Sequence, residues 1–192
     1  MELKALGIEG AWLADSPVWH DNRGHFREWF KREEILKMTG RHFEIEQANV
    51  SVSRKGSLRG IHYSNAPKGQ AKWITCVAGS IRDVIVDIRP ESKSFGHWIE
   101  VELSGSSGQA VFIGERLGHG FVALEDNTAV VYLVSTPFSP SDEFEINPLD
   151  EEIGIDWGMD PDSLKISEKD IKGRTLQSLL KLGLLPKLAQ NG

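Results

Sequence analysis

Cysteine and tyrosine are scarce in this 192-residue chain, and basic residues are outnumbered by acidic ones. Cys76 is the only cysteine, so no disulfide can form within the chain and no cluster of zinc-binding thiolates can be assembled. Lysine and arginine number 22 against 28 aspartates and glutamates, and the formal net charge of −6 argues against a nucleic-acid or membrane-surface partner.

Long apolar runs are also missing. No stretch approaches the ~20 apolar residues of a membrane span, and the opening MELKALGIEGAW lacks the apolar core of a secretory signal. We therefore expect a cytoplasmic protein without a membrane partner. The length suits one domain, which we expect over residues 1–192, with an irregular and helical C-terminal segment from about residue 155.

Short β-forming runs separated by turn residues recur through the middle of the chain, a pattern typical of an all-β sandwich or barrel. The runs are FEIEQANVSVS, SLRGIHYS, AKWITCV, SIRDVIVDIR, HWIEVELS, QAVFIG and TAVVYLVS. Two of the turns, at 78–80 and 125–127, predict β-hairpins. Helical spacing of apolar residues is confined to KREEILKM and TLQSLLKLGLL, so we expect helices that flank a β core.

The stretch GSLRGIHYSNAPKGQAKWITC places Arg59, His62 and Lys72 on two consecutive predicted strands. A guanidinium and an ammonium bind phosphate oxygens well, although a pair of solvated surface charges is the commoner arrangement. The His62 side chain should project to one face of its strand while Tyr63 projects to the other. Histidine suits proton transfer near neutral pH, and the alternative is a hydrogen-bonded histidine in the wall of the fold.

Because Tyr63 points away, Tyr132 is the only phenol that could share a pocket with His62, the alternative being core packing. Asp83 and Asp87 share one face of the run SIRDVIVDIR, where they could orient a histidine, pair with Lys72, or be solvated.

Metal-binding and phosphate-loop motifs are missing from the sequence. There is no H-x-H pair and no H-E-x-x-H motif, so a metal site would need His62, His119 and scattered carboxylates, and we expect none. The segment GSSG lies between predicted strands and reads as a turn, so any nucleotide would be bound by side chains.

An ordered set of motifs resembles the dTDP-4-dehydrorhamnose 3,5-epimerase family across nearly the whole chain. The motifs are SVSRKGSLRGIHY, QAKWITCVAGSIRDVIVDIR, SKSFGHW, GHGFVALEDNTAVVYLV and GIDW. The resemblance implies an all-β, cupin-like jelly-roll β-barrel with short flanking helices, working as a homodimer with N-terminal strand exchange and without metal or cofactor. It implies an isomerase that inverts C3, C5 or both in dTDP-4-keto-6-deoxyglucose or a related dTDP-sugar of deoxysugar biosynthesis.

The same resemblance assigns residues. His62 matches the base, Tyr132 the acid and Asp170 the carboxylate that orients the base, while Lys72 is the expected stabiliser of an enolate. Substrate-binding positions of the family match Arg23, Phe26, Glu28, Gln47, Asn49, Arg59, His119, Phe138, Glu143 and Lys169. Arg23 and Phe26 are expected to come from the partner chain, and Phe26 and Phe138 to flank the thymine. Phe138 departs from a common pattern in which that aromatic is a tyrosine.

Two other functions stay open at the level of sequence. A related cupin could be a dTDP-sugar 3,4-ketoisomerase that uses a similar histidine, or a noncatalytic sugar-nucleotide-binding protein. The Tyr132 motif and the SEKD element favour epimerisation.

Overall fold

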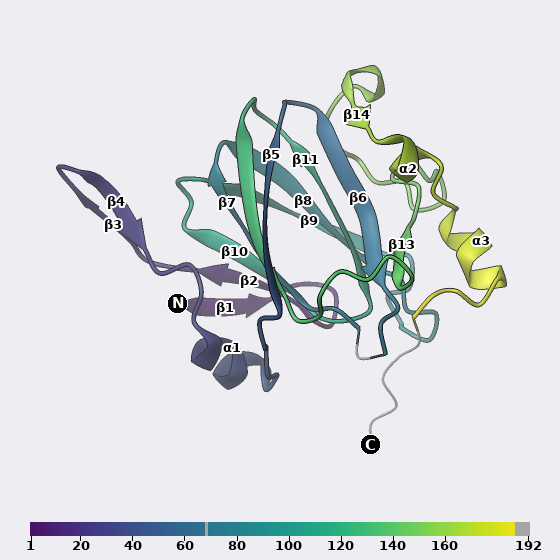
Figure 1. Cartoon of the computed structure of the whole chain (residues 1–192), viewed down its shortest axis with the longest axis horizontal. Coiled ribbons are helices and arrows are strands. Elements are labelled where there is room, and N and C mark those ends of the chain that lie inside the picture. Colours follow the sequence, from purple (N-terminus) through teal and green to yellow (C-terminus); the bar gives the residue numbers. More distant parts are fainter. Residues whose placement is uncertain (68, 187–192) are drawn as a thin grey trace.

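Two β-sheets face each other in the computed structural model, which describes residues 1–67 and 69–186 (Figure 1). The first sheet has the strand order β1-β2-β10-β7-β12-β5. The second has the order β13-β6-β11-β8-β9, with β14 paired to β6. The all-β, jelly-roll prediction is confirmed, as two facing sheets that are not joined into a closed barrel within these ranges.

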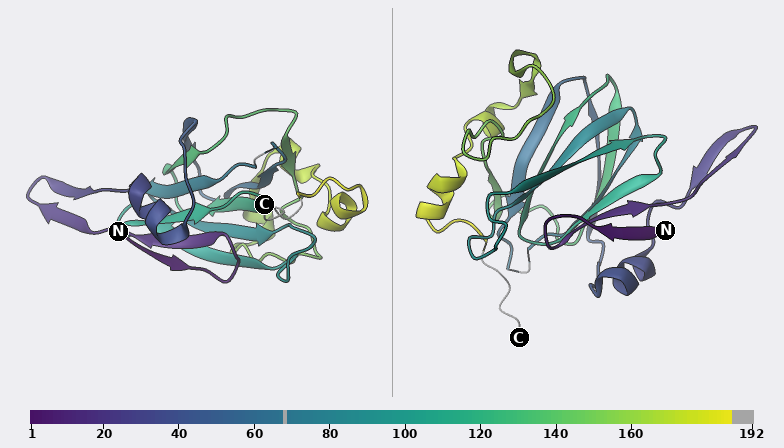
Figure 2. Two further views of the ribbon diagram at one scale, coloured as in Figure 1. Left: turned by 90° about the horizontal axis from the view of Figure 1, so that it is seen from below. Right: turned by 180° about the vertical axis from the view of Figure 1, so that it is seen from behind.

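The strands of the first sheet are β1 (Glu2–Ala5), β2 (Ala11–Asp15), β10 (Gln109–Ile113), β7 (Lys72–Ala78), β12 (Thr128–Val134) and β5 (Gln47–Ser53). Those of the second are β13 (Glu143–Glu145), β6 (Ser57–Ser64), β11 (Leu117–Ala123), β8 (Ser80–Asp87), β9 (Trp98–Ser104) and β14 (Lys165–Ile166). A separate hairpin of β3 (Val18–Asp21) and β4 (Gly24–Arg27), here called the arm, projects from the body in Figure 1 and in both views of Figure 2.

Both flanking helices are found where the helical spacing predicts them. They are α1 (Arg32–Thr39) and α3 (Leu176–Lys181). The segment expected to be irregular also holds a 3-10 helix (Pro161–Ser163), β14 and the four-residue helix α2 (Glu168–Ile171). No helix in the described ranges has the length and hydropathy of a membrane span.

Both predicted hairpins are wrong, because the strands on either side of each turn belong to different sheets. β7 lies in the first sheet and β8 in the second, and likewise β12 lies in the first and β11 in the second. The two turns contact each other at one end of the sandwich, where the Leu124 N–H donates to the Ser80 carbonyl at 2.9 Å. Alternating apolar residues with a short turn are common to a hairpin and to a strand pair that crosses between sheets.

Three apolar clusters hold the layers together. One fills part of the space between the sheets, including Ile74, Ile85 and Val130. A second packs the C-terminal segment, including Trp157 and Leu176, against β6 residues such as Tyr63. The third, which includes Ile35, Phe43, Trp73 and Phe112, joins α1 to the first sheet. The interior is therefore apolar over only part of its extent, which leaves room for a polar cavity.

A bulge in β6 sets the direction of its polar side chains. His62 lies opposite His119 of β11, whereas Arg59 lies opposite Phe121, so β6 has one extra residue between the two pairs. The bulge allows Arg59 and His62, three residues apart, to face the same cavity. Gly60 sits inside it with a φ of 129°, and a Cβ there would lie 2.5 Å from the Cα of Gly120.

Replacing Gly60 by alanine is expected to lower the free energy of unfolding by about 1–3 kcal/mol through backbone strain alone, with the contact to Gly120 adding to it. Gly7→Ala is the matched control, because its Cβ would meet only the Ile99 Cγ2 atom at 3.7 Å; its effect should stay within about 0.5 kcal/mol. Urea unfolding of both variants measures the difference. Equal stability of the two variants would contradict the close approach of β6 and β11.

Candidate active site

A polar cavity of about 500 Å³ opens between the inner faces of the two sheets. A second cavity of about 300 Å³ adjoins it, since His62, Lys72, Tyr132 and Lys169 line both. His62 comes from β6 in the second sheet, while Lys72 and Tyr132 come from β7 and β12 in the first. Groups from both walls and from α2 therefore meet where the two cavities join.

Most of the predicted site residues are brought together at these cavities. The larger cavity is also lined by Arg59, His119 and Asp170, and the smaller by Gln47, Asn49, Phe138 and Glu143.

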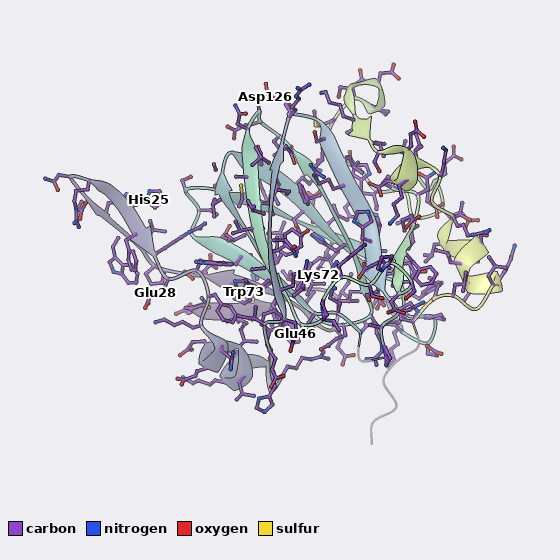
Figure 3. All side chains as sticks on the ribbon, in the orientation of Figure 1. His25, Glu28, Glu46, Lys72, Trp73 and Asp126 are labelled. Carbon is purple, nitrogen blue, oxygen red and sulfur yellow. The ribbon has the colours of Figure 1, made fainter. Side chains whose placement is uncertain are left out.

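Arg23, Phe26 and Glu28 do not line either cavity of their own chain. Arg23 and Phe26 lie on the arm, and Glu28 follows it directly. Figure 3 shows Lys72 within the sandwich and Glu28 at the base of the arm, apart from each other in this view.

The alternation of side chains between the two faces of β5 explains one wall of the site. Gln47, Asn49 and Ser51 face the cavities, while the intervening Val50 and Val52 are 67% and 62% exposed on the other face. Ser51 was not among the predicted site residues, although the period of two that includes Gln47 and Asn49 could have found it. Its hydroxyl is buried and has no hydrogen-bond partner among the described residues.

His62 is held by Asp170. The His62 Nε2 atom lies 2.7 Å from the Asp170 Oδ1 atom, although the two residues are 108 positions apart. Ser167 caps α2 by accepting a hydrogen bond from the Asp170 N–H at 3.0 Å. With Nε2–H donating to the carboxylate, the neutral His62 ring presents an unprotonated Nδ1, which is the form a general base needs.

The pKa of Asp170 lies below its usual range. Burial acts to raise it, but hydrogen bonds from His62, Ser167 and the Gly60 backbone, together with the charge of His62, lower it further than burial raises it. Asp170 is only 4% exposed, so this carboxylate is an ionised group within the wall of the cavity.

A second histidine is held in the same way. His119 lies directly opposite His62 in the register of β6 and β11, and its Nε2 atom is 2.7 Å from the Asp83 Oδ2 atom. Of the alternatives left open for Asp83 and Asp87, solvation is wrong, because both are fully buried. Asp83 orients a histidine, and Asp87 accepts from Arg89, Ser92 and Ser94; neither forms an ion pair with Lys72.

The Nε2 atoms of both histidines are paired with carboxylates. Among the described residues, no group of three or more histidine, cysteine, aspartate or glutamate side chains is arranged to hold a metal ion.

Lys72 is a buried cation with unused hydrogen-bond donors. Burial lowers its pKa, and the charges of Glu143 and Asp83 oppose this shift. Within the described residues its ammonium makes no hydrogen bond and no ion pair of 4.0 Å or less. Its three N–H groups are therefore available to a bound molecule.

Tyr132 is a protonated phenol on the wall opposite His62. Burial raises its pKa, the charge of Arg59 opposes this, and the charge of Glu143 adds to it, so the net shift is upward. The hydroxyl therefore remains a proton donor throughout the neutral range. A base on one wall, and an acid and a cation on the other, are suited to moving a proton on a carbon next to a carbonyl group.

Comparison with known proteins places this arrangement in a chemical context. Residues 5–178 match the family model described as dTDP-4-dehydrorhamnose 3,5-epimerase. A dTDP-4-dehydro-6-deoxyglucose 3-epimerase of a Streptomyces species is 42% identical over 94% of this chain and 92% of its own. The dTDP-4-dehydrorhamnose 3,5-epimerase of Mycolicibacterium smegmatis is 40% identical over 97% and 91%.

The fold is similar to that of a solved relative with a bound ligand. A 3'-monoepimerase from Streptomyces bikiniensis, in complex with dTDP-quinovose, superposes with a TM-score of 0.89 at 41% identity, covering 95% of this chain and 91% of that one.

Replacing Asp170 by asparagine is expected to lower the free energy of unfolding at pH 7 by about 1–3 kcal/mol, because a charged hydrogen bond to His62 is lost. A carboxylate with a lowered pKa stabilises the fold above its unfolded pKa of about 3.9, and this contribution is lost as the pH falls through the folded pKa. The gap between the free energies of unfolding of variant and wild type should therefore have its full size well above a pH of about 3.9 and narrow as the pH falls below that value.

Urea unfolding across that range measures the gap, with Glu168→Gln on the exposed face of the same helix as control. A gap of constant size at every pH would mean that the variant disturbs packing and not a charge.

Proposed function

The chain belongs to the dTDP-4-dehydrorhamnose 3,5-epimerase family, and from this premise we propose how its cavity inverts a carbon next to the ketone of a dTDP-4-keto-6-deoxy sugar. It is an isomerase of the kind that acts on sugar nucleotides in deoxysugar biosynthesis. The observation that carries the mechanism is the position of His62 and Tyr132 on facing sheets of one cavity, with Lys72 where the two cavities join.

His62 removes the proton. A C–H bond next to a ketone is acidic because the resulting anion is shared with the ketone oxygen, so a base must reach the carbon while a positive charge meets the oxygen. The Nδ1 atom of His62 is that base, and Asp170 fixes the ring and stabilises the imidazolium that forms. A positioned base of this kind contributes about 10²–10⁴-fold to the rate.

Lys72 stabilises the enolate oxygen. Its donors are free, and its charge is buried, so its interaction with a developing oxyanion is stronger than it would be in water. Tyr132 then returns a proton to the opposite face of the same carbon, which inverts it. The proton leaves and returns without a change of oxidation state, so the proposed reaction uses no cofactor.

The nucleotide is bound by the remaining residues of the two cavities. Arg59 and Lys169 supply positive charge for the diphosphate, and Gln47, Asn49, His119 and Glu143 supply polar contacts. Phe138 is 59% exposed at the smaller cavity, and its ring offers a stacking face for the thymine without the hydroxyl of a tyrosine. The complex of the similar 3'-monoepimerase with dTDP-quinovose supports the binding of a dTDP-sugar.

The arm completes the site of a partner chain in the proposed homodimer. It projects from the body, its Trp19 and Phe26 rings stack with centroids 5.8 Å apart, and both rings are largely exposed. Strand β5 is an edge strand of the first sheet within the described residues, and its Val50 and Val52 side chains are exposed on the outer face. This edge is therefore available for exchange of N-terminal strands. Arg23, Phe26 and Glu28 would then reach the substrate from the neighbouring chain.

Two further expectations stay predictions. We propose one epimerase domain over residues 1–192, supported by the contribution of β14 and α2 to the cavity; residues 187–192 lie outside the described residues. A cytoplasmic location is proposed as well.

Incubation of dTDP-4-keto-6-deoxyglucose with the protein in D₂O, followed by NMR, tests the function directly. An epimerase incorporates deuterium at inverted carbons, whereas a 3,4-ketoisomerase moves the ketone and a noncatalytic binding protein exchanges nothing. Relatives named as 3-epimerase and 3,5-epimerase are similarly close, at 42% and 40% identity. The identity of the carbons that carry deuterium and also change configuration, C3, C5 or both, then gives the positions inverted.

Tyr132→Phe is expected to separate the two halves of the reaction. His62 can still form the enolate and return a proton to the original face, so recovered substrate should carry deuterium while inversion falls by about 10²–10⁴-fold. His62→Ala should abolish both exchange and inversion. NMR in D₂O measures both.

Tyr63→Phe is the matched control, because its hydroxyl donates to the Leu184 carbonyl at 3.3 Å behind β6 and takes no part in the cavity. It should invert substrate as the wild type does. Inversion by Tyr132→Phe at the wild-type rate would assign the acid to another group.

Mixing two inactive variants tests whether the arm acts on the partner. Arg23→Ala and His62→Ala should each lose most activity alone. In a mixed dimer, one of the two sites has an intact His62 from one chain and an intact Arg23 from the other, while the second site has neither. Because random pairing makes about half of the dimers mixed, co-expression should restore about a quarter of wild-type activity. No recovery in isolated mixed dimers, or a fully active monomer by light scattering, would show that Arg23 does not act across chains.

A further inference from the structure

Asp83 is a fully buried carboxylate directly behind the cavity wall. Its Oδ2 atom pairs with His119 at 2.7 Å, while its Oδ1 atom is buried and has no hydrogen-bond partner among the described residues. A buried acceptor left without a partner costs about 1–3 kcal/mol. Such a group in a folded protein calls for a functional explanation.

Lys72 is a buried group of opposite charge that lines the same cavity as His119, the partner of Asp83. The charge of Asp83 acts on this ammonium, and so does that of Glu143, but neither carboxylate comes within ion-pair distance of it. A carboxylate in direct contact would take up the ammonium hydrogens and compete with any bound oxygen. A carboxylate beyond ion-pair distance, with one oxygen already bonded to His119, stabilises the positive charge of Lys72 without occupying the N–H donors of its ammonium.

We propose that Asp83 is a positioning residue, which holds His119 in one orientation and keeps Lys72 protonated while its hydrogens stay free for the substrate oxygen. The proposal rests on the function proposed above for Lys72 and extends it to a residue outside the cavity lining.

Other charged and titratable groups around Lys72 do not perform this task. The charged and titratable groups that line the two cavities with it are Arg59, His62, His119, Tyr132, Glu143, Lys165, Lys169 and Asp170. Asp170 is a carboxylate as well, but it is bonded to His62 and does not contribute to the shift in the pKa of Lys72. Glu143 also carries a negative charge, but it is only partly buried and lines the smaller cavity, where a substrate contacts it. The charge of Asp83 is fully buried and is therefore less screened by solvent and salt.

The sign of the effect on pH dependence follows from these charges. Burial lowers the pKa of Lys72, and Asp83 opposes that shift, so removing the charge of Asp83 lowers this pKa further. Because protonated Lys72 stabilises the enolate, activity should then be lost at a lower pH on the alkaline side.

Asp83→Asn, which keeps the shape of the side chain, tests the proposal. Its kcat should fall by about 10- to 100-fold, the size typical when a group supporting a functional side chain is lost, with a smaller change in KM. The alkaline limb of its kcat profile should move to lower pH. If the alkaline limb of the kcat profile lies at the same pH in Asp83→Asn as in the wild type, the proposal is overturned.

Asp87→Asn is the matched control. Asp87 lies on the same strand and is equally buried, but its partners Arg89, Ser92 and Ser94 lie outside both cavities. This variant should unfold more easily while its pH profile keeps the wild-type shape. A shift of the same size in Asp87→Asn would overturn the assignment to Asp83.

A stability comparison keeps the proposal testable even if Asp83→Asn alone does not fold. Lys72→Met leaves the charge of Asp83 buried without its counter-charge, and adding Asp83→Asn should restore part of the lost free energy of unfolding. A double variant no more stable than Lys72→Met would overturn the charge coupling. A wild-type protein without deuterium exchange would instead refute the proposed function, and the stability comparison would still report on the coupling.

Discussion

The hydrogen bond between His62 and Asp170 is the interaction on which the site depends. It joins two segments 108 residues apart, and each supplies something the other lacks. Strand β6 supplies His62, which faces the cavity. The C-terminal segment supplies the Asp170 carboxylate, the lining residue Lys169 and strand β14, which pairs with β6. The bond adds a directed link to a segment that is also held by the pairing of β14 with β6, by backbone hydrogen bonds such as that from the Lys165 N–H to the Gly56 carbonyl, and by apolar contacts.

Negative charges at different depths balance the positive charge of the cavities. The chain as a whole is acidic, yet Arg59, Lys72 and Lys169 gather at the cavities. Asp83 is buried outside the cavity lining, whereas Asp170 and Glu143 line the cavities. The two buried carboxylates contact histidines and make no ion pair with Lys72, which leaves the N–H donors of Lys72 for a ligand.

Much of the sheet structure was predictable from alternation, and the failures have physical causes. All seven predicted runs contain strands, whereas β1 to β4, β13 and β14 lie outside them. Of β11, only the end was expected, as the first strand of the predicted hairpin at 125–127, since Gly118 and Gly120 interrupt its apolar pattern. The two hairpins were wrong because a local pattern does not say which sheet the next strand joins. Among site residues, the opposite faces of His62 and Tyr63 follow from the pleat. Asp170 came only from the family resemblance, because the bond it makes depends on the folded position of a distant helix.

The exposed arm and the unpaired edge of β5 have a consequence for the newly made chain. Two aromatic rings on a thin hairpin, at 49% and 65% exposure, and two valines on an edge strand form the kind of surface that pairs with any extended segment it meets. In the proposed homodimer, association that covers these surfaces competes with aggregation, and both are favoured by a higher chain concentration, the open-ended assembly more steeply than the closed pair. The features proposed to let one chain serve its neighbour's substrate are thus also the ones that expose a newly made chain to aggregation.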